Sequence, residues 1–277
     1  MDLSAISAAI NSVCSAWLKT DSNKLGLTTL LYFGFFAIMV AIYYRRAVMT
    51  TDPLPKLRRI PGLDAIDEAI GRATEMGRPV TYNTGASAIS APTLAAMAIL
   101  GYVAKQTARY DTRIIVPLRF PEVLPLAQST IQMAHIEVGK PDTYRADDIR
   151  YISNDQFGFT SGCIGIIKRE KVAAQLMFGA FMSEALILAE EGNIAGAIQI
   201  AGQTVTAQTP FLIAACDYTL MVEELYVASA YLAKDRVRTG MLAAQDISKI
   251  VLIVLILLGI VFNTFGSTFI QDIMSLY

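Results

Sequence analysis

The stretch AGAIQIAGQTVTAQTP, residues 195–210, is the part of the sequence that decides the fold. Its first half contains a short apolar run, GAIQIAG (196–202), and its polar second half ends in Thr209 and Pro210 before another apolar segment. A short apolar run, a polar loop and a proline near a helix start are typical of a strand that leads into a helix. We predict a strand over 196–202 and a helix from Pro210 to about Lys234.

The same alternation recurs through the middle of the chain. Strands are predicted over 79–83, 112–118 and 147–153, and helices over 64–77, 93–110, 121–139 and 180–191. Residues 163–178 suggest a hairpin or two short strands around the charged turn 168–171. Strands that alternate with helices indicate βαβ units. The predicted fold class is therefore α/β, with a Rossmann-like, mostly parallel sheet, helices on both faces and strands that are apolar at nearly every position.

Two uncharged segments, 25–44 and 250–270, flank this domain. The chain is 54% hydrophobic and only 17% charged, whereas soluble domains average about 25% charged. Each segment is long enough to cross a hydrocarbon core of about 30 Å as a helix. We therefore predict two transmembrane helices, with the α/β domain inserted between them. The apolar run 172–188 contains Glu184 and the run after Pro210 is broken by Asp217, so both are assigned to the soluble part.

Basic residues predict the orientation in the membrane. Arg45 and Arg46 follow the first span directly, and Arg236, Arg238 and Lys249 precede the second. Arginine and lysine resist translocation, so the middle of the chain is expected in the cytoplasm and both termini outside the plasma membrane. The predicted parts are an extracytoplasmic helix and turn (1–24), the first span (25–44), a proline-rich connector (45–61), the cytosolic domain (62–240), a linker (241–249), the second span (250–270) and an extracytoplasmic tail (271–277). The N-terminal helix is expected either on the membrane surface or against a neighbouring subunit.

Polar residues follow each predicted strand, where the carboxyl ends of parallel strands share one edge. If these loops converge, they form a site for a polar or phosphorylated ligand, and helix N-termini there favour anions. The candidate ligand-binding residues are Thr84, Gly85, Ser87, Ser90, Arg119, Asn154, Asp155, Gln203, Thr204 and Thr206.

The alternative interpretation of the same loops is structural. Ser90 and Thr209 stand where N-caps with a following proline are expected, and Arg119 has Glu122 nearby as a possible ion-pair partner. The loop that begins at Thr84 has a single glycine and matches no phosphate-binding motif.

No catalytic or metal-binding set is recognisable in the sequence, and no cofactor is predicted. His135 is the sole histidine and has no cysteine or histidine at ligand spacing. Cys163 and Cys216 are expected to be small buried residues in a reducing compartment. Glu184 and Asp217 are carboxylates in apolar surroundings, for which a cap, an ion pair or a subunit contact is expected. The net charge of −1, with scattered basic residues, argues against nucleic acid as a partner.

Several long phrases resemble a family of uncharacterised prokaryotic membrane-anchored proteins, a domain of unknown function. They are GLDAIDEAIGRATEMGRPV (62–80), LGYVAKQTARYDTRIIVP (100–117), IGIIKREKVAAQLMFGAF (164–181), SEALILAEEGNIAGAIQIAG (183–202) and ACDYTLMVEELYVASAYL (215–232). The resemblance covers about residues 50–240. It implies that a membrane-tethered α/β domain recurs as a unit in prokaryotes, and it brings no activity and no functional residue.

Two functions are compatible with these observations. Small and apolar residues on nearly every helix favour a scaffold or accessory subunit that assembles into a homo-oligomer or a larger membrane complex. The alternative is a domain that binds a nucleotide or small phosphorylated metabolite in the loops at the carboxyl ends of the strands. The fold alone does not imply an enzyme.

Overall fold

The structure is a computed structural model that describes residues 27–49, 61–233 and 236–264. The chain divides into two units. One is Leu57–Asp235, and the other combines Met1–Lys56 with Arg236–Tyr277.

The larger unit is built on a six-stranded sheet. Its strands are β1 (Val80–Asn83), β2 (Ile114–Leu118), β3 (Ile149–Tyr151), β4 (Ala174–Gly179), β5 (Ile198–Gln203) and β6 (Tyr218–Met221). The strand order is β3-β2-β1-β4-β5-β6, and each neighbouring pair is parallel. The predicted α/β class is confirmed. This order is that of the Rossmann fold, whose two halves meet at the switch point between β1 and β4.

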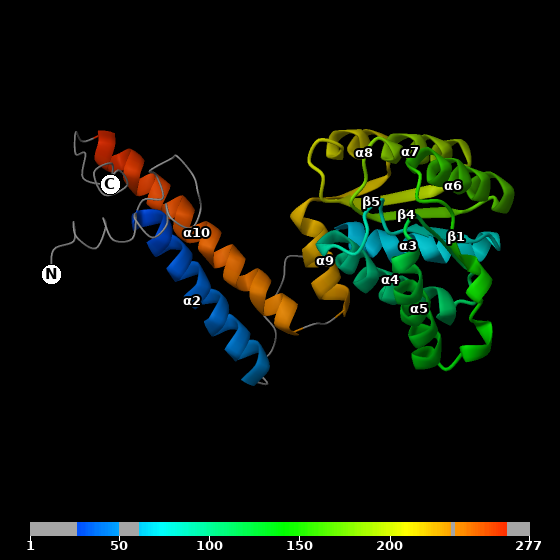
Figure 1. Ribbon diagram of the computed structural model, residues 1–277, viewed down its shortest axis with the longest axis horizontal. Helices are drawn as coiled ribbons and strands as arrows, with labels where there is room; N and C mark the ends of the chain where they lie inside the picture. The colour runs from blue at the N-terminus through cyan, green and yellow to red at the C-terminus, as the bar shows by residue number, and fades with distance from the viewer. Residues whose placement is uncertain (1–26, 50–60, 234–235, 265–277) are drawn as a thin grey trace. The chain divides into compact units, whose positions relative to one another are not determined.

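Helices cover both faces of the sheet and make three layers (Figure 1). The first face carries α3 (Pro61–Met76), α4 (Ala91–Arg109), α5 (Leu124–Val138) and α9 (Glu223–Ala233). The second face carries α6 (Gln156–Glu170), α7 (Glu184–Ile194) and α8 (Thr209–Ala215). Short 3₁₀ turns occupy Pro121–Val123, Pro141–Thr143 and Ala146–Asp148.

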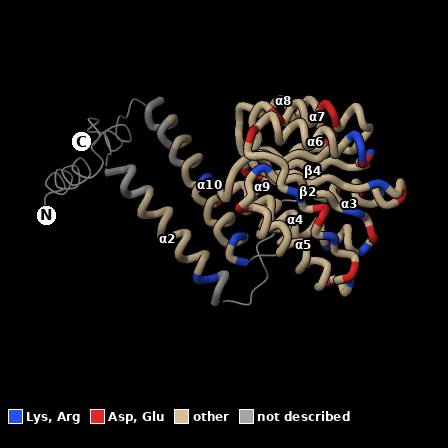
Figure 2. The backbone as a smooth tube through the Cα atoms, turned by 45° about the vertical axis from the view of Figure 1, so that its right-hand side comes forward, with Lys and Arg blue, Asp and Glu red and all other residues tan. Residues whose placement is uncertain are grey.

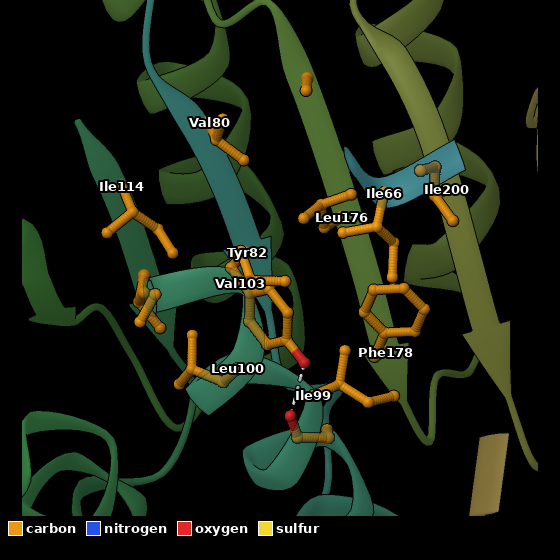
Figure 3. Packing of buried hydrophobic residues seen from close by; sticks show 14 of the residues in the cluster. Ile66, Val80, Tyr82, Ile99, Leu100, Val103, Ile114, Leu176, Phe178 and Ile200 are labelled. Atoms are coloured by element: carbon orange, nitrogen blue, oxygen red, sulfur yellow. Dashed lines mark hydrogen bonds between the residues drawn. The ribbon is translucent and has the colours of Figure 1, made fainter. Parts of the chain in front are cut away.

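The first face of the sheet holds the main hydrophobic core (Figure 3). Successive strand residues alternate between faces, and those that point to this side are apolar. Tyr82 of β1 lies with its ring centroid 5.7 Å from that of Phe178 of β4. Its hydroxyl donates to the carbonyl of Ala96 at 2.5 Å, which satisfies the one polar atom that the tyrosine brings into the core. The tyrosine therefore links β1 to α4.

The second face differs from the expectation of strands that are apolar at nearly every position. Its strand residues include buried polar side chains, namely Thr81, Asn83, Gln175, Gln199 and Gln203. Gln175 and Gln199 are register partners on β4 and β5. Their side-chain amides donate to the carbonyls of Leu188 (3.1 Å) and Ala189 (2.8 Å) in α7. These amides therefore attach α7 to the sheet, a role that an apolar strand could not fill.

The predicted hairpin over 163–178 is wrong. Residues 163–170 belong to α6, and a single strand, β4, begins at Ala174. Asp155 starts the helix, because its carboxylate accepts the backbone N–H of Gly158 at 2.7 Å. Phe159, Cys163 and Ile167, spaced four residues apart, are buried on one side of α6. The cap and this spacing stabilise a helix up to Glu170, so the charged residues 168–171 lie at the end of α6 and not in a hairpin turn.

The continuous helix predicted from Pro210 to Lys234 is also wrong. The helix α8 ends at Ala215, Cys216 is extended, and β6 follows before α9 begins at Glu223. The carboxylate of Asp217 accepts the backbone N–H of Gln199 at 2.8 Å, which holds this segment beside β5. Residues 218–221 therefore form an edge strand paired with β5, although the sequence pattern favours a helix.

In the smaller unit the structure describes two long helices, α2 (Leu27–Met49) and α10 (Arg236–Thr264), which lie side by side and run antiparallel (Figure 1). Figure 2 shows that basic residues of α2 gather at its C-terminal end, where Arg45 and Arg46 stand. Within the described residues, no helix combines the length and apolarity needed to cross a bilayer. The predicted linker 241–249 forms part of α10. The predicted N-terminal helix and turn (1–24), most of the connector 45–61 and the tail 271–277 lie outside the described residues.

Candidate functional site

The carboxyl edge of the sheet is where the sequence places its candidate ligand site. At the switch point, β1 leads into Thr84 and Gly85, and β4 ends at Gly179. The two chain segments touch there: the N–H of Ala86 donates to the carbonyl of Ala180 at 2.7 Å. A Cβ added to Gly179 would lie 2.3 Å from the carbonyl oxygen of Thr84. The loops after β1 and β4 are therefore in direct backbone contact at the switch point, where Rossmann proteins bind their dinucleotide.

Arg119, the expected anion contact, binds backbone oxygens. Its Nε donates to the carbonyl of Asn154 at 3.1 Å, and its Nη1 to the carbonyl of Ala86 at 3.3 Å. The guanidinium carbon lies 5.3 Å from the ring centroid of Phe120. Glu122 is exposed and makes no ion pair with Arg119. Arg119 thus connects the loops that follow β1, β2 and β3.

The remaining candidates around β3 and α4 also have local partners. The backbone N–H of Asn154 donates to the hydroxyl of Tyr151, and Asp155 caps α6. Ser90 occupies the N-cap position of α4, and its hydroxyl lies 2.9 Å from that of Thr93. Ser87 is half-buried in the loop before it. These residues shape loops and helix starts.

Gln203, the last residue of β5, has a buried side-chain oxygen, Oε1, without a partner among the described residues. Its Nε2 donates to the carbonyl of Val205 at 2.9 Å. Thr204 is half-buried and Thr206 exposed. The N-cap of α8 is Gln208 and not Thr209, whose hydroxyl donates to the carbonyl of Val205 at 3.1 Å.

Glu184 is a fully buried carboxylate at the first position of α7. It accepts the backbone N–H of Met182 at 3.0 Å and a short hydrogen bond from the side-chain amide of Gln156. The positive end of the helix dipole also favours a negative charge there. Its role is therefore to join the N-termini of α6 and α7.

Neither Cys163 nor Cys216 has the environment of a reactive thiol. Burial raises the pKa of the Cys163 thiol far above its ordinary value, and burial and Asp217 raise the pKa of Cys216 to about 12. A nucleophilic or metal-binding cysteine needs a lowered pKa. Among the described residues, no cluster of histidine, cysteine or carboxylate side chains has the geometry of a metal site.

A hollow in the described part lies at the opposite, amino edge of the sheet. It has a volume of about 320 Å³ and lies between the C-terminal parts of α4 and α5 and the starts of β2 and β3. His135, Arg113, Arg145 and Asp142 line it. Sequence reasoning missed it, although the charged segment KPDTYRADDIR (140–150) follows the sole histidine closely.

Residues 16–274 match a family described as a domain of unknown function, DUF6754. The chain belongs to this family. No curated protein and no solved structure matches it. Membership in DUF6754 shows that the family's domain includes both helices of the smaller unit. It assigns no function, so a function must be inferred from the geometry of the molecule.

Proposed function

We propose that this DUF6754 protein is a membrane-tethered scaffold whose α/β domain self-assembles through the outer surface of α6, α7 and α8. The observation that carries the proposal is that α7 is apolar on both sides. Its inner side packs Ala185, Leu188 and Ala189 against the sheet, and its outer side exposes Leu186 and Ile187. Large apolar side chains on the outer side of a helix are expected to be covered by a partner surface.

The exposed apolar surface extends beyond α7. It comprises Phe157 of α6, Met182, Leu186, Ile187 and Ile194 on or beside α7, and Phe211 and Ile213 of α8, with exposed fractions from 38% to 70%. We call these seven residues the α7 patch. Side chains of this size that are about half exposed leave on the order of 100 Å² each, or roughly 700 Å² in total. The largest apolar patch on an ordinary monomer is about 300–600 Å².

A second copy of the chain is the occupant that this area favours. A stable interface buries about 800 Å² on each partner, and homodimer interfaces are more apolar than other interfaces. The patch contains no basic residue, and Glu190 is the exposed acidic residue on α7. Attraction between opposite charges therefore contributes little, and apolar burial is the main driving force. Attachment to one membrane would also raise the local concentration of copies.

The membrane attachment rests on the helices α2 and α10. Large apolar side chains are exposed on both, including Phe33, Ile38 and Ile42 of α2 and Ile253, Ile256, Leu257 and Ile260 of α10. The uncharged stretches 25–44 and 250–270 continue past the described residues. We assign the pair to the bilayer, with the α/β domain on the cytoplasmic side of a prokaryotic plasma membrane. Extraction of isolated membranes with alkaline carbonate tests this, because release of the full chain into the soluble fraction would contradict it.

Light scattering of the full chain in mild detergent tests the assembly. The wild-type particle is expected to contain two or more copies, and Ile187→Asp is expected to reduce it to one. The matched control is Ile136→Asp on α5, where an isoleucine of 51% exposure lies outside the α7 patch. This control is expected to keep the wild-type mass. A monomeric wild-type particle, or equal dissociation by both variants, would refute self-assembly through this patch.

A second candidate function is recognition of a nucleotide or small phosphorylated metabolite at the carboxyl edge. The strand order favours it, because open sheets of this order bind such ligands at the switch point. It requires that Arg119 exchange its backbone acceptors for a phosphate. ATP, NAD and their analogues would then raise the melting temperature of the wild type and not of Arg119→Ala. If none of them raises it in the wild type, this candidate is removed.

A further inference from the structure

The cavity at the amino edge of the sheet has a partly buried lining and an open rim. Its walls include the apolar side chains of Ile114, Ile131 and Ile149. The lining also contains His135, whose exposed fraction is 6%, and charged residues at the rim. A volume of about 320 Å³ is at the lower end of the range for ligand pockets, about 300–1,000 Å³. This is too small for a dinucleotide and suits a metabolite of a few heavy atoms.

The hydrogen bonds of Thr143 define which nitrogen of His135 faces a ligand. The Thr143 hydroxyl donates to the carbonyl of Lys140 at 2.8 Å, so its oxygen is left to accept. The Nδ1 of His135 lies 2.8 Å from that oxygen and therefore carries the proton. Burial lowers the pKa of His135, which keeps the ring neutral at pH 7. The ring is also hydrogen bonded to the backbone of Lys140, which Thr143 contacts as well. In the neutral ring the Nε2 is then an acceptor.

The charges of the lining leave one cation and one anion available. Asp148 is neutralised by Arg113 and Arg150, and Asp111 by Lys140. Arg145 and Asp142 form no ion pair or side-chain hydrogen bond within the described part of the chain. Both are exposed at the rim, three positions apart and on either side of Thr143. The cavity therefore presents a positive group, a negative group and a neutral acceptor nitrogen.

We propose that the cavity binds a small zwitterion of the size and charge pattern of a free α-amino acid. The carboxylate of the ligand pairs with the guanidinium of Arg145. Its ammonium donates to the carboxylate of Asp142 and to Nε2 of His135, and its side chain packs against Ile114 and Ile131. A simple anion or a simple cation satisfies only half of this arrangement, so the site selects for a molecule that carries both charges. The proposal does not depend on self-assembly or on a ligand at the carboxyl edge.

The single histidine of the chain provides a direct readout. The full chain in detergent micelles gives one imidazole Cε1–H resonance by NMR, and that resonance belongs to His135. The standard L-amino acids are added one at a time at millimolar concentration and constant pH, with acetate and methylammonium as half-ligand probes. At least one amino acid is expected to shift the resonance saturably. No shift with any of them, or an equal shift with acetate or methylammonium, would overturn the proposal.

Charge-neutral variants separate binding at this site from unspecific effects. Arg145→Gln and Asp142→Asn replace exposed side chains and should leave the fold intact, which circular dichroism checks. Each removes a charge-assisted contact and is expected to weaken binding about tenfold. The matched control is Arg169→Gln, an exposed arginine of α6 that does not line the cavity. Retained affinity in both rim variants, or a comparable loss in the control, would contradict the assignment.

Discussion

Gly85 and Gly179 lie in direct backbone contact at the point where the two halves of the sheet meet. A Cβ added to Gly85 would lie 2.7 Å from the amide nitrogen of Ala180 and 3.2 Å from the α-carbon of Gly179. Both residues have positive φ, +86° and +140°. Only glycine combines this conformation with so close an approach. The contact lets the loops after β1 and β4 hydrogen bond to each other across the switch point.

Gly85→Ala is therefore expected to destabilise the α/β domain strongly. A left-handed alanine costs about 1–2 kcal/mol, and forcing an extra methyl group into a packed site adds about 1–3 kcal/mol. The matched control is Gly139→Ala, because Gly139 has nearly the same φ, +79°, and nothing within 4 Å of an added Cβ. Gly139→Ala therefore carries only the cost of a left-handed alanine and no overpacking cost. Thermal unfolding of both variants measures the difference, and equal melting temperatures would mean that the loops are not in contact.

Replacement of Gly192 by alanine is expected to destabilise the protein, whereas the same replacement at Gly71, another helical glycine, is expected to stabilise it. A Cβ on Gly192 of α7 would lie 2.4 Å from Oε1 of Gln175 and 2.6 Å from Oε1 of Gln199. Both oxygens are buried without a hydrogen-bond donor among the described residues, so they pack against the α-carbon of Gly192. Gly192→Ala should therefore lower stability by about 1–3 kcal/mol.

The comparison for this position is Gly71→Ala in α3, where nothing lies within 4 Å of the added methyl group. Alanine is favoured over glycine inside a helix by roughly 0.5–1 kcal/mol, so this variant should be more stable than the wild type. Denaturant unfolding of both proteins checks the sign. A stabilising effect of Gly192→Ala would show that the glutamine side chains do not lie over this helix.

Arg113→Leu is expected to be strongly destabilising. The guanidinium binds both oxygens of Asp148, at 2.6 and 2.9 Å, and one oxygen of Glu170 at 2.7 Å. The side chain of Asp148 is only 6% exposed, so removal of the arginine leaves a buried carboxylate with the weaker contact to Arg150 at 3.4 Å. Loss of one partner of a buried pair costs about 3–5 kcal/mol.

Two further variants test whether burial explains that loss. The double variant Arg113→Leu with Asp148→Leu removes the stranded charge and should recover much of the stability. Lys105→Leu breaks the ion pair with Glu137, in which both side chains are at least 40% exposed, and should cost less than about 1 kcal/mol. If Lys105→Leu and Arg113→Leu lower the midpoint of unfolding equally, the burial of Asp148 is not the cause.

Stability should fall on acidification through the ordinary pKa of histidine. Burial lowers the pKa of His135 from 6.5 in the folded state, so the unfolded chain takes up its proton at higher pH. The unfolded state then binds more protons, and the free energy of unfolding decreases as the pH falls below about 6.5. The decrease ends below the folded-state pKa, where both states are protonated.

His135→Gln is the control for this prediction, because it removes the only histidine. Melting temperatures of the full chain between about pH 7.5 and 5.5 should decline for the wild type and remain flatter for the variant. An equal decline in both would assign the effect to carboxylates, and a rise of wild-type stability with acid would contradict a lowered histidine pKa.

The sequence predicted the α/β class because strand and helix patterns are local. The runs that became β1, β2 and β5 are short and each is followed by a polar loop, so each could be recognised alone. The strand β6 could not, because Tyr218–Met221 forms a strand only through pairing with β5 and through Asp217. Similarly, the cap by Asp155 and the packing of Phe159 and Cys163 decided the helix α6.

The candidate site shows the same division between what local sequence patterns predict and what tertiary contacts decide. The sequence determined that polar residues follow strands, and so which loops meet at the carboxyl edge, because chain direction and a parallel sheet fix that edge. Only the tertiary structure decided that Gly85 contacts Gly179, that Arg119 is bound to backbone oxygens, and that His135 faces a hollow at the other edge. These features depend on distances between segments far apart along the chain, and no local pattern of residues encodes such distances.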